Sequence, residues 1–428
     1  MASSTTTTWS EYLFEMQGRV QAVYSSDHPW LAELNGYDSD SEKAGGRFTK
    51  DFDRNRTTFS GSQVRHTIDP YGMQAGGWVA QTGTWNVPVP PESEQVTLTL
   101  KRFVQPFSLT IDVERDSLNN SNAKAVARHV MKAREAVARN ENIAFLGDGT
   151  GLLATVTGGT SPGLTLSVSG VNWNVMLPGL VIDVLTRSNG ADPGAGLRRK
   201  IASVSRTTAS TGTITLSTTQ QASDGGSGNV TFSANEGFYI SGSYGNVAQG
   251  LDQASATSGT FEGLAKTNEF WKGTDGRNGD IATLPLSDSM LDAAVIEGRR
   301  WGVGSWDFGL GDQGAINLYK QSKLALVHYK SDESKIKSGF KGILYDGADK
   351  PIPLIKEPAH TSGKVHLIRK SDFVLYGDEV GPAFLNDDGA MWRRFSRTLE
   401  KEADLLDRVE MGVVSCNSIT FLANLSVA

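Results

Sequence analysis

The sequence has one cysteine and lacks the short patterns that accompany the best-known catalytic and metal sites. Cys416 is the only cysteine among 428 residues, so an intramolecular disulfide is excluded. The thiol lies in the strand-like run VVSCNSITFLA, where we expect it to pack as a small buried hydrophobic group. HExxH, CxxC and GxxxxGK(S/T) do not occur, so zinc-protease, paired-cysteine and P-loop sites are not expected. We expect no cofactor.

The chain also lacks long apolar runs and an excess of positive charge. No run reaches the roughly 18 apolar residues of a membrane span, and the start MASSTTTTWSEYLFEM has neither the basic nor the apolar part of a signal peptide. The net charge is −6, which argues against a general nucleic-acid coat but leaves room for contact through a local patch. We expect no membrane contact, and use or assembly in a cytoplasm.

Histidines and acids give no evident metal site. His360 and His366 flank a TSGKV turn, and we identify no close ligand pair among the six histidines, so a zinc site is not expected. The acidic run 38–42 lacks the glycine and the final glutamate of a calcium-binding loop, and we interpret it as a solvated linker. The histidines are His28, His66, His129, His328, His360 and His366.

One long helix is the clearest element of the sequence. Apolar residues recur at helical spacing from Ala123 to Ala144, and Ser121 or Asn122 can cap the start. About 24 residues at 1.5 Å each give a helix roughly 36 Å long. The sequence Gly-Asp-Gly-Thr-Gly over 147–151 follows this helix. A phosphate-binding loop precedes a helix instead, so we interpret Gly147 as a left-handed C-cap, before a tight turn into a strand.

Residues 152–240 have the composition of a small all-β domain. Gly, Ser, Thr and Val dominate, and short strand-like runs alternate with turn signals such as NGADPGAG and SDGGSGN. This pattern predicts a barrel or a sandwich inserted between helix-bearing segments. A GxSxG pattern occurs at Gly159–Gly163, but Ser161 is followed by strand-like sequence and not by the helix of a nucleophile elbow. We interpret it as a turn.

The N-terminal part reads as an arm followed by an extension. Residues 1–45 contain a helix-like piece with apolar residues at spacings of three and four. Residues 46–94 are too long for a simple loop and too polar for a core, which suits a two-stranded arm that reaches another molecule. Residues 95–113 alternate as two strands, with the break expected at Pro106.

The C-terminal part mixes helices and strands. Helix-like runs start near Ser287 and Gly314, and strand-like runs cover 342–357, 364–376 and 409–426. The basic run 393–397 either touches phosphate or pairs with the acids of EKEADLLDRVE.

The order and lengths of these parts resemble the major capsid protein of tailed bacteriophages, with the Hong Kong 97-like fold. The resemblance implies an α+β chain divided into an N-terminal arm (1–45), extended loop (46–94), peripheral strands and spine helix (95–151), inserted β-barrel or sandwich (152–240), return segment (241–283), axial domain (284–400) and closing strands (401–428). It rests on GGRFTKDFDRNRTTFSGSQVRHTIDPYGMQAGGWVAQTGTW, EQVTLTLKRFVQPFSLTIDV, SNAKAVARHVMKAREAVARNENIAFLGDGTG and LDAAVIEGRRWG through to the C-terminal strands.

The resemblance implies a structural function. A capsid protein of this kind self-assembles as hexamers and pentamers into an icosahedral head that encloses double-stranded DNA without reading its sequence. Its partners would be a separate scaffolding protein, a portal and a decoration protein, and its location the virion capsid after assembly in the host cytoplasm. The founding member begins with a long cleaved helical segment, and from the residues of 1–45 we expect no such segment in this protein. Lys50 is the only lysine of the extension, and cross-linking is not expected.

Charge predicts the contact between subunits. Between positions 47 and 66 the extension carries five basic and two acidic residues, and we expect it to meet the acidic run 400–410 of a neighbour. The expected contact residues are Arg47, Lys50, Arg54, Arg56 and Arg65 on one side, and Glu400, Glu402, Asp404, Asp407 and Glu410 on the other.

Two alternatives stay open. One is a phage tail or adhesin component that binds a surface through the β domain. The other is a carbohydrate-active hydrolase with Asp/Glu catalysis, although no carboxylate pair among the 47 acids stands out.

Overall fold

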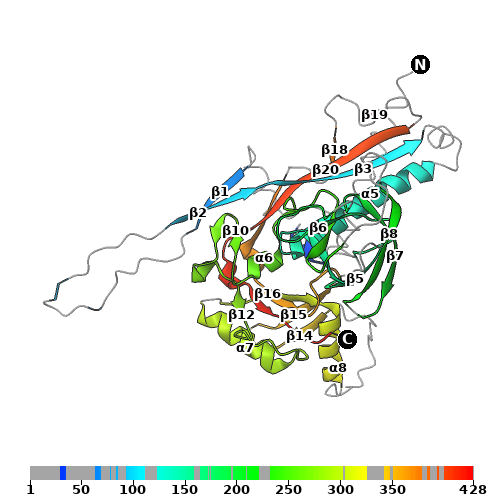
Figure 1. Cartoon of the computed structure of the whole chain (residues 1–428). Coiled ribbons are helices and arrows are strands. Elements are labelled where there is room, and N and C mark those ends of the chain that lie inside the picture. The colour runs from blue at the N-terminus through cyan, green and yellow to red at the C-terminus, as the bar shows by residue number, and fades with distance from the viewer. Residues whose placement is uncertain are drawn as a thin grey trace, which may run out of the picture.

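Two sheets, a closed barrel and one long helix form the core of the chain (Figure 1). The structure is a computed structural model that describes residues 29–34, 63–68, 78, 83–84, 93–110, 123–158, 164–171, 173, 175–193, 196–208, 210–220, 232–301, 304–324, 342–347, 350–377, 383–385, 393–394 and 400–427. Its helices are α2 (Pro29–Leu34), α5 (Ala123–Leu146), α6 (Leu251–Ser255), α7 (Asp288–Arg300) and α8 (Gln313–Leu324), with single 3-10 turns η1 (Glu269–Trp271), η2 (Lys370–Asp372) and η3 (Cys416–Ser418).

A hairpin at one end of the molecule passes directly into a sheet. Strand β1 (Gln63–Ile68) pairs antiparallel with β2 (Glu94–Thr99), and after Leu100 the chain continues as β3 (Lys101–Thr110) along β20 (Glu400–Val413). The expected break at Pro106 is wrong, because Pro106 lies within β3, opposite Asp404. Among the described residues β3 pairs only with β20, and an edge strand tolerates a proline whose missing N–H would face outward.

Strand β20 is the centre of a five-stranded sheet. Besides β3, it pairs with β17 (Phe373–Gly377), β18 (Ala383–Phe384) and β19 (Arg393–Arg394). One face of this sheet contributes Val409, Met411 and Val413 to a core that also contains Trp30 and Trp271. Cys416 is fully buried in this core, as the sequence predicts.

Helix α5 covers β3 and is held by its apolar stripe. Val130, Val137 and Phe145 are 0–1% exposed, and their helical spacing is the pattern that predicts the helix. The expected left-handed cap at Gly147 is wrong, because positive φ occurs at Gly149 and Gly151 and not at Gly147. The Gly147 N–H instead continues the helical bonding to the carbonyl of Ile143 at 3.0 Å.

Residues 152–240 fold into a closed six-stranded barrel with its own core. The strand-like runs that the sequence shows over 152–240 include NVTFSA at 229–234, but the described residues of that run, 232–234, form no strand. Asp183 is 5% exposed and links the barrel to the segment that follows its last strand. Its carboxylate accepts hydrogen bonds from the Arg198 N–H at 2.7 Å and from the Gly242 N–H at 2.7 Å. In order around the barrel, the strands are β4 (Leu152–Gly158), β5 (Thr165–Ser169), β8 (Gly212–Gln220), β7 (Arg199–Arg206), β6 (Val181–Thr186) and β9 (Glu236–Ile240).

A six-stranded mixed sheet with two helices forms the lower part of Figure 1. Ser287 caps α7 by accepting from the Met290 N–H at 3.4 Å, and the helix buries Leu291, Ala294 and Val295 in a third core with α8. In order, the strands are β12 (Thr274–Asp275), β21 (Thr420–Leu422), β16 (Val365–Ile368), β13 (Phe308–Asp312), β15 (Ile352–Glu357) and β14 (Gly342–Tyr345); a small hairpin of β10 (Thr260–Phe261) and β11 (Leu264–Ala265) lies outside the sheet. Both helices, and strands β14, β15, β16 and β21, lie where the sequence predicts them, whereas β12 and β13 were not predicted.

Candidate contact surfaces and buried polar clusters

The extension presents one of the predicted contact cations to solvent. Arg65 is exposed on β1, opposite Thr97 of β2. The other four predicted cations, Arg47, Lys50, Arg54 and Arg56, lie outside the described residues. Trp78, at a described position farther along the extension, is fully exposed. Figure 1 shows β1 and β2 at the edge of the molecule, where the chain leads into the extension. Val96 and Leu98 are buried, so it is the outward side chains of this hairpin, such as Arg65, that are available to another chain.

The predicted acidic partners are divided between the surface and the core. Glu402 and Asp404 are half-buried on β20, and Glu400 begins the same strand. Asp407 and Glu410 are only 5% and 1% exposed. The expectation that all five acids meet a neighbour is therefore wrong for Asp407 and Glu410, because this part of β20 runs through the centre of the sheet.

Within one chain the two predicted partners are not brought together. Figure 1 places β1 and the β19 end of β20 on opposite sides of the molecule, and that end carries Glu402, which lies opposite Arg393 of β19. Of the basic run, Arg393 and Arg394 pair through their backbone with β20, and the other three residues lie outside the described part of the chain. Whether the run pairs with the acids or touches phosphate stays a prediction. A contact between Arg65 and Glu402 requires a second copy of the chain.

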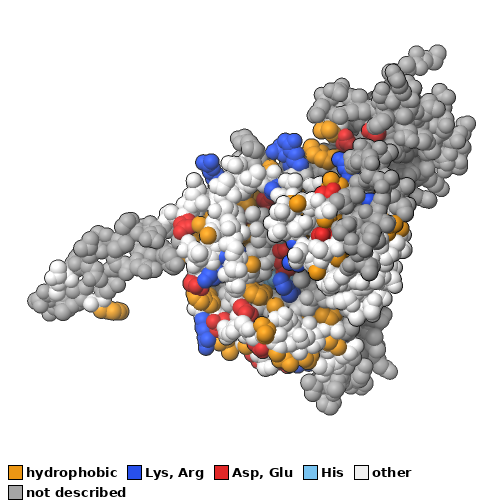
Figure 2. All heavy atoms as spheres, viewed as in Figure 1, with side chains coloured by type: hydrophobic (Ala, Val, Ile, Leu, Met, Phe, Trp, Pro, Cys, Tyr) orange, Lys and Arg blue, Asp and Glu red, His pale blue; other side chains and the backbone are white. Residues whose placement is uncertain are grey.

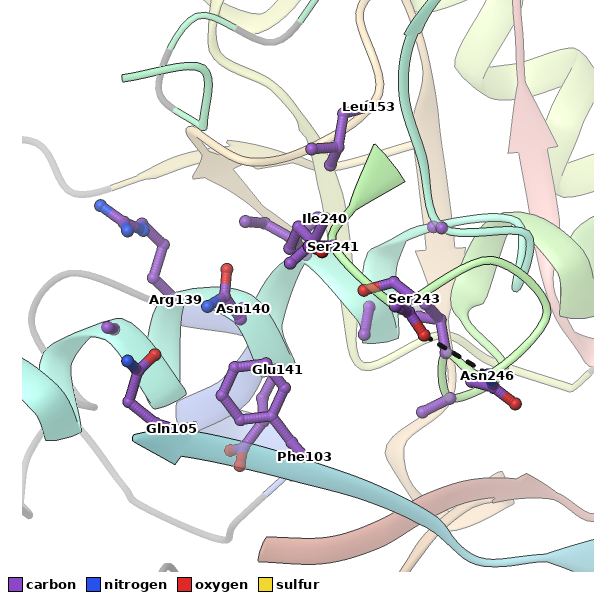
Figure 3. A pocket seen from close by; sticks show the side chains of 18 of the residues that line it. Phe103, Gln105, Arg139, Asn140, Glu141, Leu153, Ile240, Ser241, Ser243 and Asn246 are labelled. Atoms are coloured by element: carbon purple, nitrogen blue, oxygen red, sulfur yellow. Dashed lines mark hydrogen bonds between the residues drawn. The ribbon is translucent and has the colours of Figure 1, made fainter. Parts of the chain in front are cut away.

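A pocket of about 980 Å³ lies between β3, the end of α5 and the barrel. Figure 3 shows Phe103 from β3, Arg139 and Glu141 from α5 and Ile240 from the barrel around it. Burial lowers the pKa of Arg139, and Glu135 partly offsets this effect. The described lining contains no histidine or cysteine, so no side chain there is paired with an imidazole base. The pocket lies where the barrel packs against α5 and β3.

Two histidines form a buried pair that the sequence reading missed. The Nε2 atom of His360 lies 2.9 Å from Nδ1 of His366, whose Nε2 lies 2.9 Å from Oγ of Ser255. The expectation of no close ligand pair did not foresee this contact, in which one ring nitrogen of each histidine faces the other. The turn between the two histidines and the register of β16 bring them together, and the HTSGKVH spacing around a turn was the available signal.

Ser255, His366 and His360 are hydrogen-bonded in a row, as in a catalytic relay that activates a serine nucleophile, but the serine hydroxyl is closed to substrate. Such a relay needs the hydroxyl open to a substrate, whereas Ser255 is 2% exposed and His366 is 0% exposed. Burial is the main cause that lowers the pKa of both imidazoles, and the neighbouring His360 lowers that of His366 further. The arrangement acts as a neutral hydrogen-bond network within the core.

Asp252 places a negative charge next to this hydrogen-bond network. Burial alone would raise the pKa of its carboxyl, but Lys364, His366 and His360, together with the Thr361 hydroxyl, hold that pKa below its ordinary value. Lys364 Nζ lies 3.0 Å from Oδ1 of Asp252. The ion pair with Lys364 therefore helps to keep Asp252 ionised. Across the described residues, no group of three or more His, Cys, Asp or Glu side chains is placed to hold a metal ion.

The loop interpretations of Asp148 and Ser161 have different outcomes. Asp148 Oδ1 accepts from the Thr150 N–H at 3.0 Å, which closes the tight turn that the sequence predicts after α5. Ser161 lies outside the described residues. Among the helices described, none is long and apolar enough to cross a bilayer.

Comparisons with known proteins give a likeness of structure. No protein-family model matches the chain, and no curated protein matches it. The structure is similar to a chain of the cyanophage A-1(L) capsid asymmetric unit, with a TM-score of 0.52, 11% sequence identity and 93% of each chain covered. It is also similar to a chain from the capsid of a native GTA particle (TM-score 0.42, 9% identity, 86% of each chain) and one from the capsid of Myoviridae phage XM1 (TM-score 0.39, 9% identity, 87% and 88% covered). The first likeness shows a shared fold, so the resemblance expected from the sequence is confirmed at the level of a mixed α and β fold in common with that capsid chain.

Proposed function

We propose that this chain is a structural major capsid protein, which self-assembles as hexamers and pentamers into an icosahedral phage head around double-stranded DNA. The observation that carries this proposal is the fold shared with the cyanophage capsid chain over 93% of both chains. The two chains share 11% of their residues but have the same fold over most of their length, so they have the architecture in common and few particular side chains. Such conservation of shape suits a protein whose work is packing against its own copies.

The parts of the fold take the capsid roles that the resemblance implies. Residues 1–45 are the arm, 46–94 the extended loop, and 95–151 the peripheral strands with α5 as the spine helix. The barrel over 152–240 is an inserted domain, and 241–283 return the chain to the body. Residues 284–400 form the axial domain and 401–428 the closing strands.

The contact between subunits is electrostatic in this proposal. The extension of one subunit, with Arg47, Lys50, Arg54, Arg56 and Arg65, lies over Glu400, Glu402 and Asp404 of a neighbour. The placement of Arg65 and Glu402 at opposite ends of one chain supports a contact between chains. One exposed ion pair contributes only about 0–1 kcal/mol. A closed shell repeats the contact in every subunit, so that small terms accumulate through effective concentration.

The remaining partners follow from the same role. A separate scaffolding protein, a portal and a decoration protein complete the particle, which assembles in the host cytoplasm and becomes the virion capsid. DNA contact is not sequence-specific, and the protein has no cofactor and no turnover. The burial of Ser255 and His366 supports the absence of an open nucleophile in this cluster.

Electron microscopy of the chain co-expressed with the genes beside it tests the proposal. Closed shells, or hexameric and pentameric rings, are the expected products. A tail component would form tubes or single rings of another symmetry, and an adhesin would stay unassembled while it binds cells through the barrel. Either outcome would replace the capsid assignment.

A further inference from the structure

Glu262 occupies an unusual position at the tip of the β10–β11 hairpin. It is not a glycine, yet its φ is 51°, followed by 79° at Gly263. Two-residue hairpin turns with positive φ at both central positions favour Asn-Gly or Gly-Gly, so the backbone alone would not select glutamate here. The side chain is 1% exposed. Strained backbone conformations persist where the surroundings hold them, which directs attention to what Glu262 contacts.

Glu262 joins three separate parts of the fold. Its carbonyl accepts from the Thr97 N–H of β2 at 3.1 Å, and its carboxylate Oε1 accepts from the Val413 N–H of β20 at 2.7 Å. Its own N–H donates to Oε1 of Gln249 at 3.1 Å. One residue therefore links the base of the extended hairpin, the central strand of the five-stranded sheet, and the segment that leaves the barrel.

A second carboxyl completes the chain of contacts. The Gln249 N–H donates to Oε1 of Glu410 at 2.6 Å. Glu410 is 1% exposed, and its Oε2 atom has no hydrogen-bond partner among the described residues. A buried, incompletely bonded carboxylate is costly as an anion, and two neighbouring carboxyls in a low-dielectric site do not both ionise readily.

We propose that Glu262, Gln249 and Glu410 form a proton-dependent latch that fixes the base of the β1–β2 hairpin to β20. The closed latch holds at least one proton on the two carboxyls. Loss of that proton leaves two negative charges in the core, and the linked segments separate at Thr97, Gln249 and Val413. The latch belongs to the single subunit and does not require assembly.

The charges around the latch support this reading. Burial raises the pKa of Glu410 to about 8, with Lys101 opposing the shift, and raises the pKa of Glu262 well above its usual value, with Glu410 adding to it. Lys266 is a cation that opposes the shift at Glu262, but burial lowers the pKa of Lys266 itself, and its Nζ donates to the carbonyls of Ala254 and Ala256. Cys416 and Tyr376 are further titratable neighbours. Burial raises the pKa of each, so both side chains are neutral at physiological pH.

The direction of the pH effect follows from linkage. A carboxyl whose pKa is raised on folding stabilises the closed form below its unfolded pKa, and the stabilisation is lost as pH rises through the folded pKa. For one group that titrates at about 8 when closed and about 4.5 when open, raising the pH from 6 to 8 increases local opening by up to about 50-fold. The latch is therefore closed in mild acid and weakened in mild alkali.

Hydrogen–deuterium exchange of the unassembled subunit tests the latch. Protection factors, corrected for the chemical exchange rate at each pH, are compared at pH 6 and pH 8 for segments 94–100, 247–250 and 411–414. In the wild type these three segments should lose protection together, by up to about 50-fold. Strand β5 (Thr165–Ser169) lies in the separate barrel core and serves as the internal reference, whose protection should not change.

Variants separate the latch from other titrating groups. Glu262→Gln/Glu410→Gln keeps an acceptor oxygen at both positions but cannot ionise, so protection at the three segments should be equal at the two pH values. Glu269→Gln, an exposed change on the neighbouring turn η1, should behave as the wild type. Equal protection at pH 6 and 8 in the wild type, or a loss shared by β5, would overturn the proposal, as would an unchanged loss in the double variant. The wild-type series decides alone if the double variant does not fold.

Discussion

The Nε2 atom of His360 and the Nδ1 atom of His366 lie 2.9 Å apart in a core where neither ring is more than 3% exposed. Only one of these two atoms carries a proton in a neutral pair. A second proton at this contact would set two N–H groups against each other and make one ring a buried cation. The pair therefore makes the folded state sensitive to acid.

Protonation of this pair should destabilise the subunit below pH 6.5. Burial lowers the pKa of both histidines in the folded state, whereas the unfolded value is about 6.5. The unfolded state then binds more protons, so stability is present above pH 6.5 and is lost as pH falls below it, by at most about 1.4 kcal/mol per pH unit for each histidine. The measurement is the free energy of unfolding in urea at pH 7.5 and pH 5.5.

The Glu262–Glu410 pair contributes the opposite slope, so a variant isolates the histidines. His360→Gln/His366→Gln retains donors and acceptors but does not titrate. The stability of the wild type relative to this variant should fall between pH 7.5 and pH 5.5. A constant difference would show that the imidazoles do not control acid sensitivity.

Trp30 is expected to be a main anchor of the N-terminal segment. Its indole is 1% exposed, packs edge-on against Phe373 with ring centroids 5.3 Å apart, and donates to the Phe145 carbonyl at 3.3 Å. Trp30→Ala should lower the free energy of unfolding by about 3–5 kcal/mol, through lost burial and the cavity left behind. Trp301→Ala is the matched control because that indole is 44% exposed, and its loss should be about 1 kcal/mol or less. Equal losses would show that Trp30 is not an anchor.

The barrel should fold alone, and more stably with two extra residues. Its core is separate from the other two, so fragment 152–240 should give a β-type circular dichroism spectrum and a cooperative melt. Adding Ser241 and Gly242 restores two donors to the Asp183 carboxylate, at 3.0 and 2.7 Å. Hydrogen bonds to a charged group contribute about 1.5–3 kcal/mol each, so 152–242 should melt at a higher temperature. A disordered fragment would contradict the modular reading, and identical melts would contradict the role of Asp183.

Charge reversal in the extension should block assembly without unfolding the subunit. Arg54→Glu/Arg56→Glu places negative charge where a neighbour presents Glu402 and Asp404, and surface charges away from caps and cores seldom unfold a protein. Particle yield should fall while the melting temperature of the unassembled subunit is unchanged. Arg187→Glu/Lys200→Glu makes the same charge change at exposed positions of the barrel and should assemble normally. Normal particles from the first variant would remove the extension from the contact, and a melted subunit would place it in the core.

Local patterns in the sequence predicted most of the elements. The apolar stripe through Val130 and Val137 predicted α5, and the alternation of Val96 and Leu98, which are 0% and 1% exposed, predicted β2. Such periodicities depend only on residues close in the chain. The division into capsid domains and the subunit contact remain predictions, because both concern how this chain meets other copies.

Several missed features depend on contacts between distant segments. Pro106 stays within a strand because β20, about three hundred positions later, sets the length of β3. Asp407 and Glu410 lie three positions apart, and so on opposite faces of β20, and both are covered. An acidic run does not reveal which of its positions the rest of the chain covers. Glu262 meets Val413 only after both sheets have formed.

Cryo-electron microscopy of particles from the co-expressed chain tests the central claim most directly. The account predicts a closed icosahedral shell in which each subunit has the fold described here, with the β1–β2 hairpin and its extension lying over the Glu402 end of β20 in a neighbour. Two results would contradict it: a chain that stays monomeric when all the neighbouring genes are co-expressed, or shells in which the extension folds back on its own subunit.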